Sequence, residues 1–226
     1  MEAKILIQFP TRQRPQKFLH VAKQYIDLLN NKTDWVMNVS CDIDDATMNN
    51  PRMIKKVYDL APDGFIILAF NDNHSKIEAV NADVGLFEYD IILLASDDMI
   101  PKERGYDNVI RKYFKNYFPT FDGVLHFNDG NQKDTLNTLC ILGKPYYNRF
   151  QYIYHPSYFS LSADIEFDEV SRTLGKHKYI EEIIIKHEHP AYNSNIINDD
   201  LYLKNNTFAL IDKTNYNNRK ARNFGL

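Results

Sequence analysis

The stretch YDIILLASDDMIP, residues 89–101, decides the fold, because an apolar run ends in two adjacent carboxylates. Its core, DIILLA at 90–95, is short, rich in Ile and Leu, and does not alternate with polar residues. Such a run is typical of a strand that is buried on both faces, as in a parallel sheet covered by helices. Asp97 and Asp98 follow directly, so the strand is expected to end in a charged loop.

Three more runs of the same kind precede this strand, and helical segments separate them. The predicted strands cover 4–9, 35–41, 64–70 and 90–95, and the predicted helices between them cover 16–30, 51–61 and 75–82. A proline opens the second helix, and Ser75 with Glu78 forms the pattern of a capping box at the third. The order β-α-β-α-β-α-β predicts an α/β fold with a mostly parallel sheet flanked by helices.

Ligands of open α/β sheets bind beyond the carboxyl ends of the strands. The segments in that position are 10–15, 42–49, 71–76 and 96–101, and most of them are polar or acidic. Adjacent carboxylates repel one another unless a cation lies beside them, and Mg²⁺ or Mn²⁺ binds such oxygen ligands together with substrate phosphates. The alternative is an acidic turn in which Asp98 caps a helix.

Composition limits the remaining classes. The chain has 226 residues, 44% of them hydrophobic, and a net charge of −3, so no global basic field favours an extended nucleic-acid surface. Two cysteines fit a reducing compartment, and the first residues lack the pattern of a signal peptide, so a cytoplasmic protein without a transmembrane segment is expected. We expect one domain over 1–226: a ligand-binding half at 1–100, a second half at 101–211 and a basic tail at 212–226.

The stretch 89–101 resembles the metal loop of GT-A glycosyltransferases, especially family-2-like members, in which a hydrophobic strand ends in a D-x-D pattern followed by D-x-x-P. Asp97 matches the second Asp of the pattern and Asp98 the acidic residue after it. Ala95 stands where the first Asp would be, which is a departure from the family. The resemblance extends over roughly the first hundred residues, because FPTRQRP, VSCDIDDAT and SKIEAVNADV follow in the family's order.

This resemblance implies a GT-A fold with a nucleotide-sugar site. The residues that it assigns to the donor are Pro10, Thr11, Arg12, Arg14, Asp42, Asp44, Asn81, Ser96, Asp97 and, in the basic tail, Arg219. Arg12 and Arg14 would meet the diphosphate with paired hydrogen bonds, or else they are ordinary loop cations. Ala79, beside Asn81 in the third helix, would also approach the nucleotide.

Two acidic or histidine-rich places lie in the second half. In SLSADIEFDEV, the resemblance makes Asp164 the first choice and Glu166 the second for the carboxylate that deprotonates an acceptor hydroxyl, while a purely capping role for Asp164 remains open. In KHEHP, His187 and His189 lie two apart and would face the same side of a strand. By resemblance the metal ligands are Asp97, Asp98 and His189.

The implied function is metal-dependent transfer of a sugar from a nucleoside diphosphate, UDP for preference, to a hydroxyl with inversion, using Mn²⁺ or Mg²⁺. The acceptor class stays open among polysaccharide, lipid-linked sugar, protein and modified DNA base. The alternative, favoured by Ala95, is a nucleotide-sugar-binding module of the same fold without catalysis. A nucleotidyltransferase would need a glycine-rich loop after the first strand, and residues 10–15 contain no glycine.

Overall fold

The computed structural model describes residues 2–189 and 200–226. Its strands are β1 (Ile5–Thr11), β2 (Trp35–Asp42), β3 (Ile66–Asn71), β4 (Ile91–Leu94), β5 (Met99–Pro101), β6 (Val124–Phe127), β7 (Ile141–Gly143), β8 (His177–Ile180) and β9 (Ile185–His187). Its α-helices are α1 (Pro15–Leu28), α2 (Pro51–Tyr58), α3 (Lys76–Asn81), α4 (Tyr106–Tyr117), α5 (Lys144–Tyr147), α6 (Ala163–Thr173), α7 (Asp200–Asn206) and α8 (Ala209–Lys220).

Seven strands form one sheet in the order β3-β2-β1-β4-β7-β6-β8, and β5 pairs with β9 in a separate two-stranded sheet. The pairs β1–β2, β1–β4, β2–β3 and β6–β8 are parallel, whereas β7 runs antiparallel to both β4 and β6. The predicted mostly parallel α/β sheet is therefore confirmed. The strand order reverses between β1 and β4, so their carboxyl ends open the crevice in which such sheets bind ligands.

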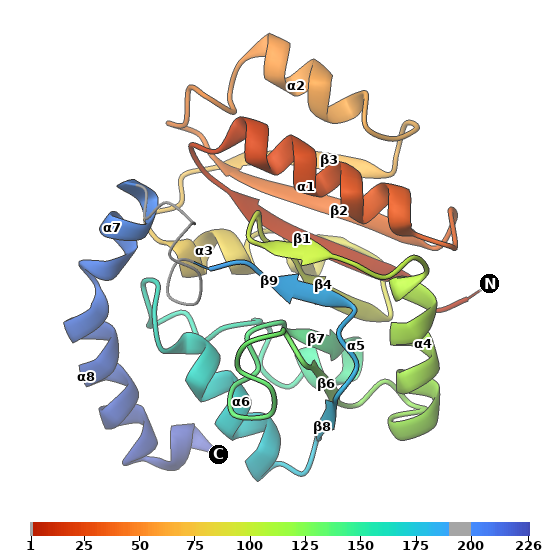
Figure 1. The fold of residues 1–226 in the computed structure, drawn as a ribbon. Coiled ribbons are helices and arrows are strands. Elements are labelled where there is room, and N and C mark those ends of the chain that lie inside the picture. Colours follow the sequence, from red (N-terminus) through yellow and green to blue (C-terminus); the bar gives the residue numbers. More distant parts are fainter. Residues whose placement is uncertain (1, 190–199) are drawn as a thin grey trace.

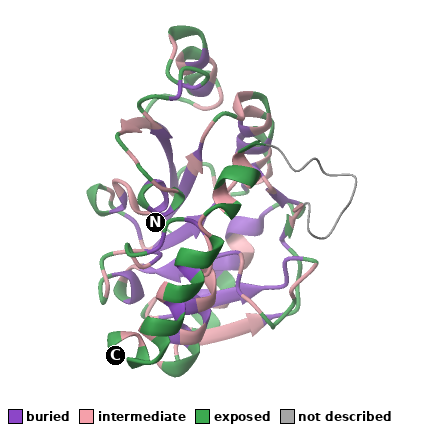
Figure 2. Cartoon of the chain, turned by 90° about the vertical axis from the view of Figure 1, so that its left-hand side faces the viewer, coloured by how far each residue is buried: buried purple, intermediate pink, exposed green. Residues whose placement is uncertain are grey.

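Helices cover both faces of this sheet (Figure 1). On β1, Ile5 and Ile7 pack in one hydrophobic cluster with α1, α2 and α4, while Leu6 packs in a second cluster with α3, α5 and α6. Figure 2 shows the strands as the most buried layer. Because successive strand residues point to opposite faces, a continuous apolar run is needed to fill both clusters.

The helix next to the crevice begins as its sequence predicts. Ser75 Oγ accepts a hydrogen bond from the backbone N–H of Glu78 at 3.1 Å and caps α3. The Glu78 carboxylate accepts from the backbone N–H of His74 at 2.6 Å, one residue earlier than in the standard capping box. These bonds fix the loop that connects β3 to α3 at the edge of the crevice.

The second half contains more regular structure than its sequence indicated. Residues 140–150, expected to be irregular, form β7 and α5, and residues 179–190 divide between β8, a loop and β9, with Pro190 outside the described residues. Much of the basic tail belongs to α8, which is largely exposed (Figure 2).

Asp212 anchors α8 to the body of the protein. Its carboxylate accepts hydrogen bonds from the backbone N–H groups of Phe159, Ser160 and Leu161 at 2.7–2.9 Å, and only 1% of the residue is exposed. Because such long-range hydrogen bonds leave no periodic pattern in the sequence, the sequence predicts only a basic tail at 212–226.

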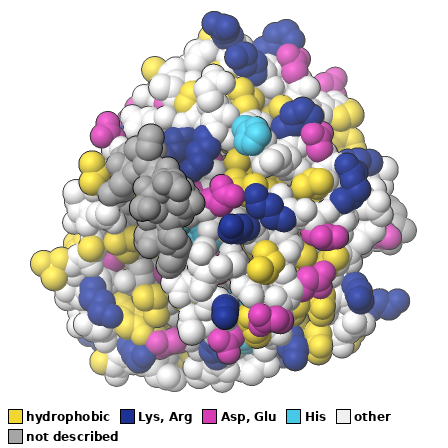
Figure 3. All heavy atoms as spheres, viewed as in Figure 1, with side chains coloured by type: hydrophobic (Ala, Val, Ile, Leu, Met, Phe, Trp, Pro, Cys, Tyr) yellow, Lys and Arg dark blue, Asp and Glu magenta, His cyan; other side chains and the backbone are white. Residues whose placement is uncertain are grey.

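None of the helices in the described part of the chain is both long and apolar enough to cross a membrane. On the face seen in Figure 3, basic and acidic side chains lie beside one another, and neither sign covers a continuous area. A charged ligand is therefore recognised by local groups, as the net charge of −3 indicated.

Candidate active site

A pocket lies beyond the carboxyl ends of β1, β2 and β4, where the strand order predicts a ligand site. Four segments line it: the loop after β1, the end of β2 with the β3–α3 loop, the loop after β4, and one side of α7. Of the residues predicted from the sequence, Pro10, Thr11, Arg12, Arg14, Asp42, Ala79, Ser96, Asp97 and Asp98 line this pocket. The carboxylates and guanidinium groups that the sequence placed at separate strand ends are thus brought together.

Asp97 is buried, with 5% of its surface exposed, and faces cations from α1 and the loop before it. Arg14 Nη1 donates to Asp97 Oδ1 at 2.9 Å, and Lys17 Nζ lies 3.6 Å from the same oxygen. Burial raises the pKa of Asp97, and the neighbouring Asp98 adds to that rise, while Arg14 and Lys17 oppose it. The two cations therefore supply the positive charge that a pair of buried carboxylates requires.

Asp98 has a different set of partners. Ser96 Oγ donates to Asp98 Oδ1, Tyr202 of α7 donates to Oδ2 at 2.8 Å, and His187 Nε2 lies 3.9 Å from Oδ2. Burial alone would raise the pKa of Asp98, but the neighbouring His187 and the hydrogen bond from Ser96 hold it well below its usual range. Asp98 is therefore ionised at neutral pH.

The two histidines of KHEHP lie beside Asp98. His187 lies between two acids, because its Nδ1 is 3.4 Å from Asp129 Oδ2 while its Nε2 faces Asp98. Burial lowers the pKa of His187, yet the hydrogen bonds with Asp129 and Asp98 outweigh it and raise the pKa to about 9. The ring of His189 lies 5.3 Å from that of His187 and 4.9 Å from that of Tyr202. We call Asp97, Asp98, His187 and His189 the donor-site cluster.

Arg12 is held by Asp42 and Asp44, the two acids that the resemblance assigns to the donor. Its guanidinium forms a paired interaction with Asp44, including Nη2 to Oδ2 at 2.9 Å, and also contacts Asp42. The Asp44 hydrogen bond is the main reason why the pKa of Arg12 lies above its ordinary value. Asn73 donates to the other oxygen of Asp42 at 2.9 Å. Arg12 and Asp42 thus form one polar wall of the pocket, and Asp44 is bonded to Arg12.

Asp164 is the predicted base, and it lies in the first turn of α6. The residue at the cap position is Ser162, and Asp164 Oδ1 accepts instead from the N–H of Ile165 at 2.9 Å. Burial raises the pKa of Asp164, and the charges of Lys76 and His187 oppose that rise. Lys76 lines the pocket and His187 contacts Asp98, whereas Asp164 itself is not among the residues that line the pocket.

Six predicted residues are not among those that line this pocket: Asp44, Asn81, Asp164, Glu166, His189 and Arg219. Three of them, Asn81, Glu166 and Arg219, bond to other parts of the chain. The Asn81 side chain donates to the Tyr154 carbonyl at 2.7 Å and accepts from the N–H groups of Ile153 and Tyr154. Arg219 forms two hydrogen bonds of 2.7 Å with Glu166, to which Tyr158 also donates at 2.7 Å. Asn81 is therefore bonded to the backbone of residues 153–154. Glu166, the second choice for the base, is paired with Arg219 of α8, which was assigned to the donor.

Sequence reasoning missed two features of the site. The first is α7, from which Tyr202 reaches Asp98 while the Arg14 guanidinium lies 4.3 Å above the Tyr202 ring. The second is a group formed by His126, Asp168 and His177, which each offer a possible metal-ligand atom within 4.8 Å of the others. None of these contacts joins residues near one another in sequence, so no motif marks them.

Comparison with known proteins supports the fold. No family model matches the chain, and no curated protein matches it by sequence. Among solved structures, the mannosyltransferase PcManGT from Pyrobaculum calidifontis, in complex with GDP-Man and Mn²⁺, is similar over 83% of this chain and 57% of its own, with a TM-score of 0.67 and 10% identity.

Residues 1–349 of TarS from S. aureus are similar over 83% of this chain and 61% of their own length, with a TM-score of 0.65 and 11% identity. The complex of the same TarS piece with UDP-GlcNAc gives a TM-score of 0.64 at 12% identity, over 81% of this chain and 58% of that one. The chain thus spans about three fifths of the length of these structures. The fold of this chain is the GT-A-like fold of glycosyltransferases, as the resemblance of residues 89–101 implied.

Proposed function

We propose that the protein is a metal-dependent glycosyltransferase, which moves a sugar from a nucleoside diphosphate, UDP for preference, to a hydroxyl acceptor with inversion at the anomeric carbon. The observation that carries the proposal is the meeting of Asp97, Asp98 and Arg14 in a pocket at the point where the strand order reverses. Solved structures with this fold were determined with GDP-Man and Mn²⁺ and with UDP-GlcNAc, which supports the choice of ligand class.

The donor set fits a divalent cation. Asp97 is buried beside the half-buried Asp98, and carboxylate oxygens are the ligands that Mn²⁺ and Mg²⁺ prefer. We propose Asp97, Asp98 and His189 as the ligands, with His187 holding Asp98 in place. When bound, the metal would neutralise the charge that develops on the leaving diphosphate.

The residues of the chain would perform the remaining steps. Arg12 and Arg14 would bind the diphosphate as charged hydrogen-bond donors, and Asp42, Asp44 and Ser96 would contact the nucleoside. Asp164 would accept the proton of the acceptor hydroxyl while that oxygen forms its bond to the anomeric carbon and the bond to the diphosphate oxygen breaks. Burial makes Asp164 a stronger base than an exposed aspartate, which suits this role.

We propose a structural role, not a catalytic or donor-binding one, for Asn81, Glu166 and Arg219. Their side chains have well-formed bonds away from the pocket, so we assign them to the stability of the second half rather than to the donor. We further propose a cytoplasmic location, which the two buried free thiols, Cys41 and Cys140, fit.

A nucleotide-sugar-binding module without catalysis is the second candidate. Ala95 favours it, because this residue stands in place of the first Asp of the pattern and is fully buried in the core. It therefore cannot offer the support that the family's first Asp gives to the ribose or the metal.

The test begins with thermal unfolding in the presence of Mn²⁺ and a set of nucleoside diphosphate sugars, since a ligand of the native state raises the melting temperature. The best ligand is then used to measure donor hydrolysis and transfer for wild type and Asp97→Ala, with the exposed Asp63→Ala as a matched control. We expect turnover by wild type and Asp63→Ala, and its loss in Asp97→Ala. Tight binding without turnover by wild type would favour the binding module. Retained turnover by Asp97→Ala would contradict the assignment of Asp97 to the metal and to the donor.

A further inference from the structure

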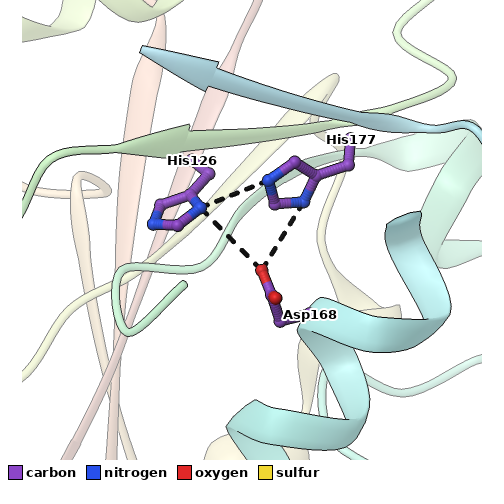
Figure 4. A group of neighbouring side chains, drawn as sticks. All are labelled: His126, Asp168 and His177. Carbon is purple, nitrogen blue, oxygen red and sulfur yellow. Dashed lines mark hydrogen bonds and ion pairs between the residues drawn. The ribbon is translucent and has the colours of Figure 1, made fainter. Parts of the chain in front are cut away.

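A second cluster of metal-binding residue types lies between the far end of the sheet and α6. His126 comes from β6, His177 from the adjacent strand β8, and Asp168 from the middle of α6, and the three side chains point toward one another (Figure 4). His126 Nδ1 lies 3.2 Å from His177 Nε2 and 3.8 Å from Asp168 Oδ1, and His177 Nδ1 lies 3.7 Å from the same oxygen. We call these residues the core cluster.

The core cluster is buried. The exposed fractions of the His126, Asp168 and His177 side chains are 1%, 7% and 6%. Asp168 Oδ1 has no hydrogen-bond partner, although its atom is inaccessible to solvent. A buried carboxylate oxygen without a partner is costly, so the cluster lacks a group that this oxygen should contact.

A hydrogen bond on the outer side of the His177 ring decides which of its nitrogens faces inward as an acceptor. Ser171 Oγ donates to the Asp168 carbonyl at 2.8 Å, so at 2.9 Å it accepts from Nδ1–H of His177. With Nδ1–H of the neutral His177 ring used in this way, its Nε2 presents a lone pair toward His126 Nδ1 at 3.2 Å.

Arg172 is the nearest cation, but its main bonds go elsewhere: Nε to Asp168 Oδ2 at 2.8 Å and Nη2 to the Asp134 carbonyl at 2.7 Å. Its Nη2 reaches His126 Nδ1 only at 3.5 Å.

We propose that the core cluster is a metal site, separate from the donor pocket, which binds a borderline divalent cation, Zn²⁺ in first place. Two imidazole nitrogens and one carboxylate oxygen are ligands that zinc prefers, and with bonds of about 2.0–2.2 Å its ligand atoms lie roughly 3–3.7 Å apart. His126 Nδ1 lies 3.2 Å from His177 Nε2 and 3.8 Å from Asp168 Oδ1, and one ligand atom from each of the three residues lies within 4.8 Å of the others before any adjustment. Ser171 and Arg172 are the outer partners that orient such ligands.

The position of this site gives it a structural role. The ion would tie β6 and β8 to α6, and α6 carries Asp164 one turn before Asp168. None of the three ligands lines the donor pocket. The inference is therefore independent of the proposed function, and it would hold for a binding module without catalysis as well.

The test is a calorimetric titration of metal-free protein with Zn²⁺ in excess Mg²⁺, which competes for the two carboxylates of the donor site more effectively than for the two imidazole groups of the core cluster. We expect wild type to bind one zinc ion per chain at the core cluster. His177→Asn and Asp168→Asn should lose that event, and Ser171→Ala, which removes only the outer hydrogen bond, should weaken it about 10–100-fold. Asp98→Asn and His155→Asn, altered outside the core cluster, should bind zinc as wild type does.

A second measurement on wild type alone covers the case in which a ligand variant fails to fold. Side-chain ¹⁵N resonances of the histidines are recorded without and with one equivalent of Zn²⁺. We expect two rings to shift together, with the inward nitrogens of His126 and His177 as the affected atoms. Absence of zinc binding by wild type, unchanged histidine resonances, or equal binding by Asp168→Asn would overturn the proposal.

Discussion

The donor-site cluster and the core cluster contain the same residue types in opposite surroundings. Asp97 and Asp98 open onto a pocket and are matched by Arg14, Lys17 and His187. In the core cluster, the cation Arg172 bonds to the outer oxygen of Asp168. A carboxylate beside a histidine can therefore have a catalytic or a structural role, and its surroundings decide which. The donor-site cluster is accessible to a ligand, whereas the core cluster is buried.

Asp98→Asn should have the largest effect, because it removes the charge of a proposed metal ligand in the donor-site cluster. We expect transfer to fall by about 10⁴-fold or more, since stabilisation of the leaving group by a metal is worth several kcal/mol and each 1.4 kcal/mol is a factor of ten. Steady-state rates at saturating Mn²⁺ give the measurement. A variant with wild-type rates would remove the distinction between the clusters, because neither would then be catalytic.

Asp164→Asn should reduce turnover by about 10²–10⁴-fold, as expected for loss of a general base. Donor affinity should change little, because Asp164 is proposed to contact the acceptor rather than the nucleotide. Turnover and calorimetric donor binding, measured side by side, separate these effects. Glu166→Gln serves as the control on the same helix, because its partner is Arg219, and it should retain most of the turnover. A larger loss in Glu166→Gln than in Asp164→Asn would exchange the two roles.

Asp168→Asn should act on stability more than on chemistry. The substitution weakens the bond with Arg172 and removes the charge of a buried carboxylate, so we expect the free energy of unfolding to fall by about 1–3 kcal/mol. Transfer should fall by less than about tenfold, because the residue reaches the reaction only through the position of α6. Urea unfolding and turnover give the two numbers. A loss of activity as large as that of Asp98→Asn at unchanged stability would contradict a structural role.

Asp122→Asn should have the smallest effect on the free energy of unfolding. Asp122 belongs to neither cluster, so this variant serves as the reference for an ordinary ion-paired acid. The hydrogen bond from Arg149, with that from Lys176, outweighs burial and lowers the pKa of Asp122 to about 2. A lowered pKa contributes stability at pH values above about 4, and this contribution is lost as the pH falls toward 2. The group is near the surface, so we expect less than about 1 kcal/mol.

Denaturant unfolding of wild type and Asp122→Asn at pH 6 and pH 3 checks that sign. The difference between the two proteins should be larger at pH 6 and shrink at pH 3. A difference that grows on acidification would mean that the ion pair does not set this pKa.

Much of the first half could be read from the chain itself. The alternation of apolar runs and amphipathic segments predicted the parallel sheet, and the strand-end rule then brought Arg14, Asp42 and Asp97 to one pocket. These inferences succeed because burial on both faces of a strand imposes a local pattern, and because parallel strands necessarily end on the same side. The resemblance of residues 89–101 added the name of the fold.

The sequence by itself determined the α/β architecture and the acidic pair at its crevice, because both follow from neighbouring residues. Only the tertiary structure decided that Asn81 bonds to residues 153–154, that Arg219 pairs with Glu166, and that α7 brings Tyr202 to Asp98. It alone joined His126, Asp168 and His177, which come from two strands and a helix. The physical reason is that periodicity reports which face of an element is buried, whereas the partner of a polar side chain depends on how distant elements pack.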